Sequence, residues 1–292
     1  MKIDDKAPAI AIMPYRSWPT FNLRNISLDD LEWPLGRPKR LLNGNLSLLS
    51  KDDHIITYPR KPVFFFLRIK VKAKISLMIV EPDIIHKHYI FLAKFLNWRF
   101  HKILTKNKTL IKCIDNGVFF YFGSTFLTNI EKINTEKKKM ASLIASSRNQ
   151  HQGHKLRHEL VTYIKKNKID IAIMGRGYKP FEKKEDGLRS YRYSIIIENS
   201  SETDYFTEKL IDSCLLETIP IYWGAPNISE YFDVRGFIVC NSIDEIKLAI
   251  NKMSEKDYVS KAKWIKKNKN IAFHHADLNN RAAQIIKQNL ID

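Results

Sequence analysis

The sequence predicts an α/β protein built on parallel sheets, and two observations lead to this fold class. Short apolar runs alternate with segments of helical periodicity through most of the chain, which is the pattern of parallel strands covered by helices. Apolar residues make up 44% of the chain, which is enough for cores of full size. The length of 292 residues fits two domains or one large one, at about 150 residues per domain.

The first half of the chain contains the less regular elements. Six of the eleven prolines lie in the first 60 residues, so we expect an irregular segment there. Strands are predicted over residues 63–69 and 75–80, and the second is apolar nearly throughout, as in a strand buried on both faces. Helical periodicity covers residues 88–100, and further strands are predicted near Ile103 and over residues 118–122.

The second half alternates more regularly. Strands are predicted over residues 140–145, 169–174, 191–197, 218–222 and 236–239, and helices over residues 154–166, 205–217 and 243–253. This order indicates a doubly wound domain, in which ligands bind beyond the carboxyl ends of the strands. The rule selects the loops that follow Ala145, Met174, Ile197 and Tyr222.

A polar, charged segment at residues 134–139 is the expected linker between two domains. We therefore predict an N-terminal domain at residues 1–135 and a C-terminal domain at residues 136–270. Residues 271–292 are predicted to form a C-terminal helix that packs back on the N-terminal domain.

The charge balance favours anionic partners. Lys and Arg number 49 against 31 Asp and Glu, which gives a net charge of +18. Nucleic acid, an acidic membrane surface and a phosphate-bearing substrate all fit this excess, as does a generally basic, solvated surface. The three cysteines are too few for a disulfide scaffold or a four-cysteine zinc site and indicate a reducing compartment. No targeting segment or unbroken apolar span is visible, so we expect a cytoplasmic chain, peripheral at the inner face of the membrane.

Two cationic residues stand where helices are predicted to begin. Asp204 is the expected N-cap of the helix after strand 191–197, which places Glu208 and Lys209 in its first turn. A lysine there opposes the helix dipole, so an external anion such as a diphosphate is a suitable partner; the alternative is a lysine extended along the surface. Arg157 follows another strand-end loop, where its guanidinium can hold phosphate or remain a solvated helix charge.

Four blocks of residues occur in a fixed order in this region. They are Tyr191-Arg192-Tyr193, Glu198-Asn199-Ser200, Asp204-Tyr205-Phe206-Thr207-Glu208-Lys209 and Pro220-Ile221-Tyr222-Trp223-Gly224-Ala225-Pro226-Asn227. Together they resemble the donor-binding signature of the α-1,3-fucosyltransferases, glycosyltransferase family 10. The resemblance extends over about residues 140–239 and implies a GT-B fold, with two Rossmann-like domains facing a cleft. The N-terminal domain would then be the acceptor side, and the C-terminal domain would bind the nucleotide sugar.

The resemblance also implies residue roles. Arg157 and Lys209 would neutralise the donor diphosphate, and Glu208 would grip donor hydroxyls or the developing oxocarbenium charge. Asn199 and Tyr205 would line the donor site. The implied reaction is an inverting transfer with no metal or other cofactor, from GDP-fucose by family default. The chain has no Asp-x-Asp metal motif. In this setting, Arg and Lys stabilise the charge left on the diphosphate.

An inverting transfer needs a general base to deprotonate the acceptor hydroxyl. The family's base is a Glu after a strand of the N-terminal domain, and Glu81 is the best match, with Asp83 in reserve. The alternative is that Glu81 is an ordinary carboxylate at a strand end. Leu216-Glu217 replaces the Ala-Gly that the family usually has before its Thr-Ile-Pro strand, so a different nucleotide sugar is a second reading of the donor.

Three further signals have competing interpretations. The spacing of His151, His154 and His158 can bind zinc, but without a nearby cysteine or carboxylate motif a polar helix face fits better. Residues 261–269 hold five lysines around one tryptophan and suit either an anionic lipid surface or a solvated helix face. The aromatic residues of helix 88–100 suit either a core or a membrane surface.

The expected function is transfer of a sugar, most simply L-fucose, to a hydroxyl of a glycan or lipid-linked glycan acceptor. Surface polysaccharide or lipopolysaccharide synthesis is the expected setting, with contact to an anionic membrane and no nucleic acid partner. The alternative reading is a basic α/β protein that binds nucleic acid through its net charge of +18.

Overall fold

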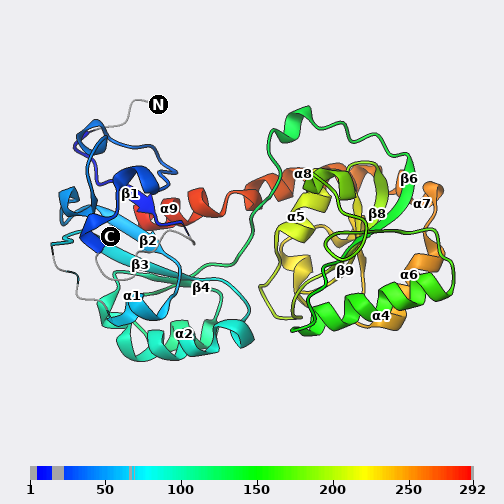
Figure 1. Cartoon of the computed structure of the whole chain (residues 1–292), viewed down its shortest axis with the longest axis horizontal. Coiled ribbons are helices and arrows are strands. Elements are labelled where there is room, and N and C mark those ends of the chain that lie inside the picture. Colours follow the sequence, from blue (N-terminus) through cyan, green and yellow to red (C-terminus); the bar gives the residue numbers. More distant parts are fainter. Residues whose placement is uncertain (1–4, 15–22, 66–67, 69, 291–292) are drawn as a thin grey trace. The chain divides into compact units, whose positions relative to one another are not determined.

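The computed structural model describes residues 5–14, 23–65, 68 and 70–290 (Figure 1). The chain divides into two compact units. The first consists of Met1–Tyr121 and Leu278–Asp292, and the second of Phe122–Asp277. Each unit contains a five-stranded sheet whose strands all pair in parallel. The predicted α/β class is therefore confirmed.

The first unit has the strand order β1-β2-β3-β4-β5. Its strands are β1 (Ile10–Ile12), β2 (His54–Thr57), β3 (Lys74–Ile79), β4 (Ile103–Thr105) and β5 (Gly117–Phe119). Its helices are α1 (Lys61–Phe65), α2 (Asp83–Leu96), α3 (Lys108–Cys113) and α9 (Leu278–Gln288). The core is aliphatic and is centred on β3 and β4, where Leu77, Ile79 and Ile103 are fully enclosed. Helix α9 contacts β1, so elements from the first and the last part of the sequence pack together in this unit.

Two predictions for this unit are wrong. Residues 61–65 form helix α1 rather than the start of a strand, and Pro62 suits a first helical turn because its missing N–H needs no partner there. Residues 66, 67 and 69 of that prediction lie outside the described part of the chain. The first 60 residues are also less irregular than expected, since they supply β1 and β2. Both strands are short, three and four residues, which is why no periodicity marked them.

The second unit has the strand order β10-β9-β8-β6-β7. Its strands are β6 (Lys139–Ile144), β7 (Ala172–Met174), β8 (Tyr191–Ile197), β9 (Ile219–Trp223) and β10 (Ile238–Val239). Its helices are α4 (Gln152–Lys166), α5 (Glu208–Leu215), α6 (Ile243–Lys252), α7 (Glu255–Ser260) and α8 (Ala262–Ala276). The helix pairs α4 with α6 and α5 with α8 flank the sheet (Figure 1). No helix within the described ranges is long and apolar enough to span a bilayer.

The strand order of the second unit fixes where a ligand can bind. From β6 the chain adds β7 on one side and then β8 on the other, with the register Ser142↔Ala172 and Ser142↔Ser194. The connections therefore diverge beyond the carboxyl ends of β6 and β8, which is the binding position in doubly wound sheets. Segment 134–139 lies within this unit, and the half-buried Lys137 donates to the carbonyl oxygens of Arg189 and Leu216.

Candidate functional site

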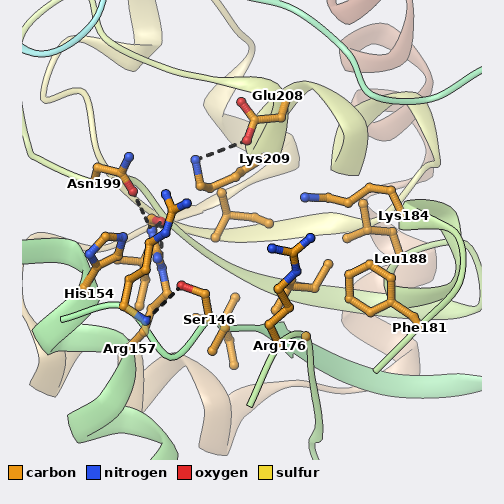
Figure 2. A pocket seen from close by; sticks show the side chains of 17 residues that line it. Ser146, His154, Arg157, Arg176, Phe181, Lys184, Leu188, Asn199, Glu208 and Lys209 are labelled. Atoms are coloured by element: carbon orange, nitrogen blue, oxygen red, sulfur yellow. Dashed lines mark hydrogen bonds and ion pairs between the residues drawn. The ribbon is translucent and has the colours of Figure 1, made fainter. Parts of the chain in front are cut away.

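A pocket of about 350 Å³ lies in the second unit, at the carboxyl ends of β6 and β8 (Figure 2). Its cationic side chains come from the loop between β6 and α4, from α4, from the start of α5 and from the segment between β7 and β8. The lining residues are Ile144, Ala145, Ser146, Arg148, His154, Arg157, Gly175, Arg176, Phe181, Lys184, Leu188, Ile195, Ile196, Ile197, Asn199, Glu208 and Lys209. Of the six residues predicted for the site, the pocket contains Arg157, Asn199, Glu208 and Lys209.

Arg157 is held at the pocket by the end of β8. Its side chain is buried, with Nε and Nη2 donating to the Ile197 carbonyl oxygen at 3.1 and 2.6 Å. Nη2 also donates to Asn199 Oδ1 at 3.2 Å. Nη1 makes no hydrogen bond within the described residues, so this edge of the guanidinium is available to a ligand. Burial lowers the pKa of Arg157, and the nearby Glu198 carboxylate opposes that shift. Such a guanidinium remains positively charged near neutral pH.

A glycine makes this placement of Arg157 possible. The N-terminal turn of α4 lies against the end of β8, where the Gly153 N–H donates to the Asn199 carbonyl oxygen at 3.0 Å. A Cβ at Gly153 would lie only 1.7 Å from the Glu198 carbonyl oxygen. The helix can approach the strand this closely only without a side chain, and Arg157 is placed one turn further along it.

The start of α5 is organised around a buried carboxylate. Glu198 has no exposed surface, and its oxygens accept from the Thr207 N–H at 2.8 Å and the Thr207 hydroxyl at 2.7 Å. Thr207 also caps the helix, since its Oγ1 accepts from the Lys209 N–H at 3.3 Å. The Lys209 ammonium donates to Glu198 Oε2 at 3.4 Å and to Glu208 Oε1 at 3.3 Å.

These carboxylates change the interpretation of Lys209. The helix dipole opposes a lysine in the first turn, but Glu198 and Glu208 supply a local counter-charge. Burial lowers the pKa of Lys209, and the two carboxylates outweigh that effect, so the net shift is upward. Burial raises the pKa of Glu208, but Lys209 and Lys184 outweigh it and the pKa falls below its usual value. Both groups are charged near neutral pH, and the Lys209 side chain remains 23% exposed toward the pocket.

Asp204 is not the helix cap. It has a φ of 61°, and the helix begins after Thr207. Its carboxylate Oδ1 accepts from Asn227 Nδ2 and from the Tyr231 hydroxyl, both at 2.7 Å. Asp204 and Asn227 thus tie together two blocks of the signature. Tyr193 likewise joins two parts of the second unit, because its hydroxyl donates a hydrogen bond to Asp257 Oδ2 at 2.8 Å.

The pocket lining also includes residues outside the predicted set, among them Lys184, Arg176 and Phe181. Lys184 and Arg176 point toward the same space as Lys209, and Phe181 lies beside them (Figure 2). The Lys184 ammonium lies 5.7 Å from the centre of the Phe126 ring, and burial lowers its pKa. Arg176 follows Met174 in one of the strand-end loops that the topology rule selected, so that rule was the available signal. Lys184 begins a short 3-10 helix, Lys184–Gly187, whose sequence contains no recognisable motif.

Tyr205 and Glu81 lie away from the pocket lining. Tyr205 is buried in the second unit. Glu81 belongs to the first unit, two residues after β3, and is half-buried. Burial, together with the charges of Glu32 and Glu81, raises the pKa of Tyr58 to about 12. The roles of Tyr205 and Glu81 stay predictions.

Asp83, the reserve base, is engaged elsewhere. It begins α2, and its carboxylate accepts from Lys106 Nζ at 2.9 Å and Asn107 Nδ2 at 2.6 Å. These two contacts hold the Asp83 carboxylate against the segment that begins α3.

The histidine cluster is not a zinc site in this structure. Both ring nitrogens of His158 are in hydrogen bonds, to the Tyr178 hydroxyl at 3.0 Å and the Arg148 carbonyl oxygen at 2.8 Å. Within the described ranges, no group of three or more His, Cys, Asp or Glu side chains is arranged to hold a metal ion. His154 is buried beside Arg157, and burial lowers its pKa to about 4.

Comparison with solved structures identifies the fold. The structure of Anabaena HepE, in complex with UDP and glucose, matches with a TM-score of 0.55 at 10% sequence identity and covers 81% of this chain and 78% of that one. TarM matches with a TM-score of 0.54 at 14% identity, covering 83% of this chain and 55% of that one. These likenesses confirm the GT-B fold class.

Comparison of sequences identifies the family. Residues 134–286, more than half of the chain, match the family described as glycosyltransferase family 10 (fucosyltransferase), C-terminal part. The Helicobacter pylori α-(1,3)-fucosyltransferase FucT is 34% identical over 68 residues, which are 23% of this chain and 14% of that protein. The matched segment thus spans about one seventh of the relative's length. On the extent of the family match, the chain belongs to glycosyltransferase family 10, the fucosyltransferases.

Proposed function

We propose that the protein transfers L-fucose from GDP-fucose to a hydroxyl of a glycan acceptor, with inversion at the sugar carbon. The observation that carries this proposal is the group of charges around one pocket: the open edge of Arg157, the ammonium of Lys209 and the carboxylate of Glu208. Membership of family 10 supports fucosyl transfer. GDP-fucose is a substrate that is consumed, and no resident cofactor is part of the proposal.

The cations suit a departing diphosphate. Breaking the sugar–phosphate bond leaves negative charge on the nucleoside diphosphate, and fixed cations that face this charge lower the barrier. Arg157 is held by the Ile197 carbonyl oxygen, so its free Nη1 does not have to be ordered during the reaction. Lys209 stands at the N-terminus of α5, where backbone N–H groups also favour an anion. Lys184 supplies a third positive charge to the same pocket.

The carboxylate of Glu208 has two tasks in this mechanism. Its pKa is held low, so it is negatively charged while the sugar–phosphate bond breaks. A negative charge on the sugar side of the pocket stabilises the positive charge that develops on the ring, or accepts hydrogen bonds from sugar hydroxyls. Glu208 also fixes Lys209 through the 3.3 Å contact, so the two residues act as a pair.

Inversion needs a base on the acceptor side, and we assign this task to Glu81 of the first unit. The family resemblance favours Glu81, and Asp83, the reserve candidate, is bound by Lys106 and Asn107. The proposal includes independence from divalent metal, an acceptor in surface polysaccharide or lipopolysaccharide synthesis, and a site of action at the inner face of the membrane. An assay in excess EDTA tests the first of these.

A thermal-shift panel of GDP, UDP, CDP and GDP-fucose tests the donor. Stabilisation follows ligand affinity, so GDP and GDP-fucose are expected to raise Tm and the pyrimidine nucleotides to leave it nearly unchanged. A larger shift with UDP would overturn the choice of donor while leaving the fold and family intact. NMR of the first product formed reports the anomeric configuration and thus tests inversion.

Substitutions at the two cations test the site. Arg157→Lys keeps the charge but loses the fork that bonds the Ile197 carbonyl oxygen, so we expect at least about 100-fold slower transfer, in the range seen when one oxyanion donor is removed. Lys209→Ala is expected to lose the GDP-induced shift. Lys166→Ala removes an exposed lysine at the far end of α4 and serves as the matched control. Wild-type turnover in either site variant would contradict the proposed donor site.

A further inference from the structure

Helix α2 of the first unit presents an aromatic stripe to solvent. Ile84, Phe91, Phe95 and Trp98 are 73%, 62%, 59% and 71% exposed. Positions 84, 91, 95 and 98 recur at intervals of seven, four and three residues, so they follow one face of the helix and the short turn after it. Phe91 and Phe95 contact each other, with ring centroids 4.9 Å apart. Single exposed apolar residues are ordinary, whereas an ordered row of four large ones marks an interaction surface.

The opposite side of α2 already supplies the core contacts. His86 and Ala93 are buried, and Tyr89, Ile90, Leu92 and Leu96 pack against the first unit's core. The Tyr89 ring stacks on Phe64 at a centroid distance of 6.1 Å. The stripe is therefore additional to what the fold requires, and its exposure works against solubility unless something covers it.

Cations flank the stripe. Lys87 and Lys94 are exposed between its aromatic positions, and neither forms an ion pair with any residue in the described ranges. The Arg99 guanidinium lies 5.4 Å from the centre of the Trp98 ring. Asp83, the acidic residue of α2, is bound by Lys106 and Asn107. The surface is thus apolar and positively charged, which matches the acyl boundary and phosphate headgroups of an anionic bilayer.

The other basic segment, at residues 261–269, is less suited to this role. Lys261 and Lys267 form ion pairs with Asp257 and Asp233, and Lys269 with Glu217 at 2.6 Å. Trp264 is half-buried under the Arg235 guanidinium, at 5.5 Å from the ring centre. Most of this charge is neutralised within the protein, and no aromatic row accompanies it.

We propose that the outer face of α2, defined by Ile84, Lys87, Phe91, Lys94, Phe95 and Trp98, docks the protein on an anionic lipid bilayer. The helix lies in the plane of the interface, its aromatic rings enter the boundary between headgroups and acyl chains, and the lysines contact lipid phosphates. This surface goes beyond sugar transfer. It gives the first unit a means of staying beside a lipid-linked or membrane-embedded acceptor, and none of its residues lines the pocket of the second unit.

Vesicle sedimentation of the full chain tests the proposal. Phosphatidylcholine vesicles are compared with and without about one third phosphatidylglycerol, for the wild type and for a Phe91→Ser/Phe95→Ser/Trp98→Ser variant. We expect binding to the anionic vesicles and at least about a 10-fold weaker partition coefficient for the variant, because interfacial affinity scales with buried apolar area. Leu248→Ser/Val259→Ser, at positions 57% and 62% exposed in the second unit, controls for loss of exposed apolar surface elsewhere.

A charge-matched pair separates local docking from the general attraction of a basic protein. Lys87→Glu/Lys94→Glu and Lys263→Glu/Lys266→Glu change the net charge equally, and all four lysines are exposed. We expect about 10-fold weaker binding or more for the first variant and less than about a 3-fold change for the second, since only the first loses contacts at the interface. This pair of charge variants also tests the proposal if the triple serine variant fails to fold.

Three results would overturn the proposal. The first is an equal loss of vesicle binding in both charge variants. The second is vesicle binding as strong as that of the wild type in both α2 variants. The third is a wild-type protein that does not bind anionic vesicles. A fourth contrary result is a concentration-dependent dimer that the serine variant abolishes, because the stripe would then bind a second copy of the chain. The GDP-induced thermal shift should be the same in all variants, which keeps this test separate from that of the proposed activity.

Discussion

Two acidic residues one turn apart on α5 show how neighbouring charges decide ionisation. Burial raises the pKa of both Glu208 and Asp212. Lys209 reverses the effect at Glu208, which is charged and lines the pocket. Asp212 has no such partner in contact. Its Oδ1 accepts from the Thr125 hydroxyl at 2.6 Å, while Oδ2 is buried without a hydrogen bond among the described residues, and its pKa rises to about 7.

This raised pKa predicts a stability that depends on pH. Because the folded-state pKa of about 7 lies above the ordinary 3.8, the folded protein holds an extra proton between about pH 4 and pH 7. The contribution of Asp212 to stability is therefore present at low pH and is lost as pH rises through 7. We expect Asp212→Asn to remove this dependence and to stabilise the protein at pH 8 by up to about 4 kcal/mol, the equivalent of a three-unit shift.

Urea denaturation at pH 5 and pH 8 measures the effect of Asp212→Asn. Asp170→Asn, at an exposed position ahead of β7, is the control for removing an acidic group from the surface. If the free energy of unfolding depends on pH in the same way in the wild type and in Asp212→Asn, then Asp212 is ionised throughout the range.

At the scale of elements, the pocket depends on the junction between α4 and β8. The N-terminal turn of α4 touches the last residues of the strand, and Gly153 is the point of contact. A second glycine has a similar role in the neighbouring loop. Gly175 has a φ of +112°, and a Cβ there would lie 2.2 Å from the Ala145 carbonyl oxygen. The pocket thus owes its shape to backbone contacts as well as to the side chains that face it.

Gly153→Ala tests the importance of this junction. The added methyl group would lie 1.7 Å from the Glu198 carbonyl oxygen, so the helix must move and carry Arg157 with it. We expect a loss of about 1–3 kcal/mol in the free energy of unfolding, as for other overpacked sites, and a GDP-induced thermal shift that is largely lost. Lys155→Ala, on the solvent side of the same turn, is the matched control. A Gly153→Ala variant that binds GDP like wild type would show that the junction tolerates displacement.

Much of this pocket could be predicted from the sequence because its parts are local. Strand β8 has the predicted bounds, since Tyr191–Ile197 is rich in tyrosine and isoleucine, residues that favour strands. Glu208 and Lys209 stand in the first turn of the next helix, as expected. What could not be predicted depends on long-range packing. Glu198 accepts a hydrogen bond from the N–H of the cap residue Thr207, nine positions further along the chain. Lys184 reaches the pocket from a short 3-10 helix between β7 and β8 that no periodicity marks.

The exposed face of α2 illustrates the same limit. Its periodicity predicts an amphipathic helix but does not say which of two apolar faces enters the core. The structure places Ala93 and Leu96 inward and leaves the larger Phe91 and Trp98 outside. Hydrophobicity of single residues would have given the opposite assignment, because aromatic side chains gain most from burial.

At the scale of the whole molecule, the chain builds two units with separate cores and closes the first with its last helix. Helix α9 returns to β1, and Leu278, Ala282, Ala283 and Ile286 are its buried residues. Arg281 adds a contact with the Tyr121 ring, 4.4 Å from its centre. The pocket at the carboxyl ends of β6 and β8, by contrast, is lined entirely by residues of the second unit. A substitution that destabilises α9 should therefore affect the stability of the first unit, whereas nucleotide binding should affect that of the second.

Ile286→Ala, which removes a fully enclosed side chain from α9, tests this separation of the two units. A cavity at such a site costs about 2–5 kcal/mol, so amide hydrogen exchange in β2 and β3 is expected to accelerate by on the order of 100-fold. Exchange in β6 and β8 should be unchanged, and GDP should slow it equally in wild type and variant. Gln284→Ala, at an exposed position of the same helix, controls for altered helix propensity. Equal acceleration in both sheets would mean instead that the two cores unfold together, and the first unit would then contribute to nucleotide binding through the stability of the second.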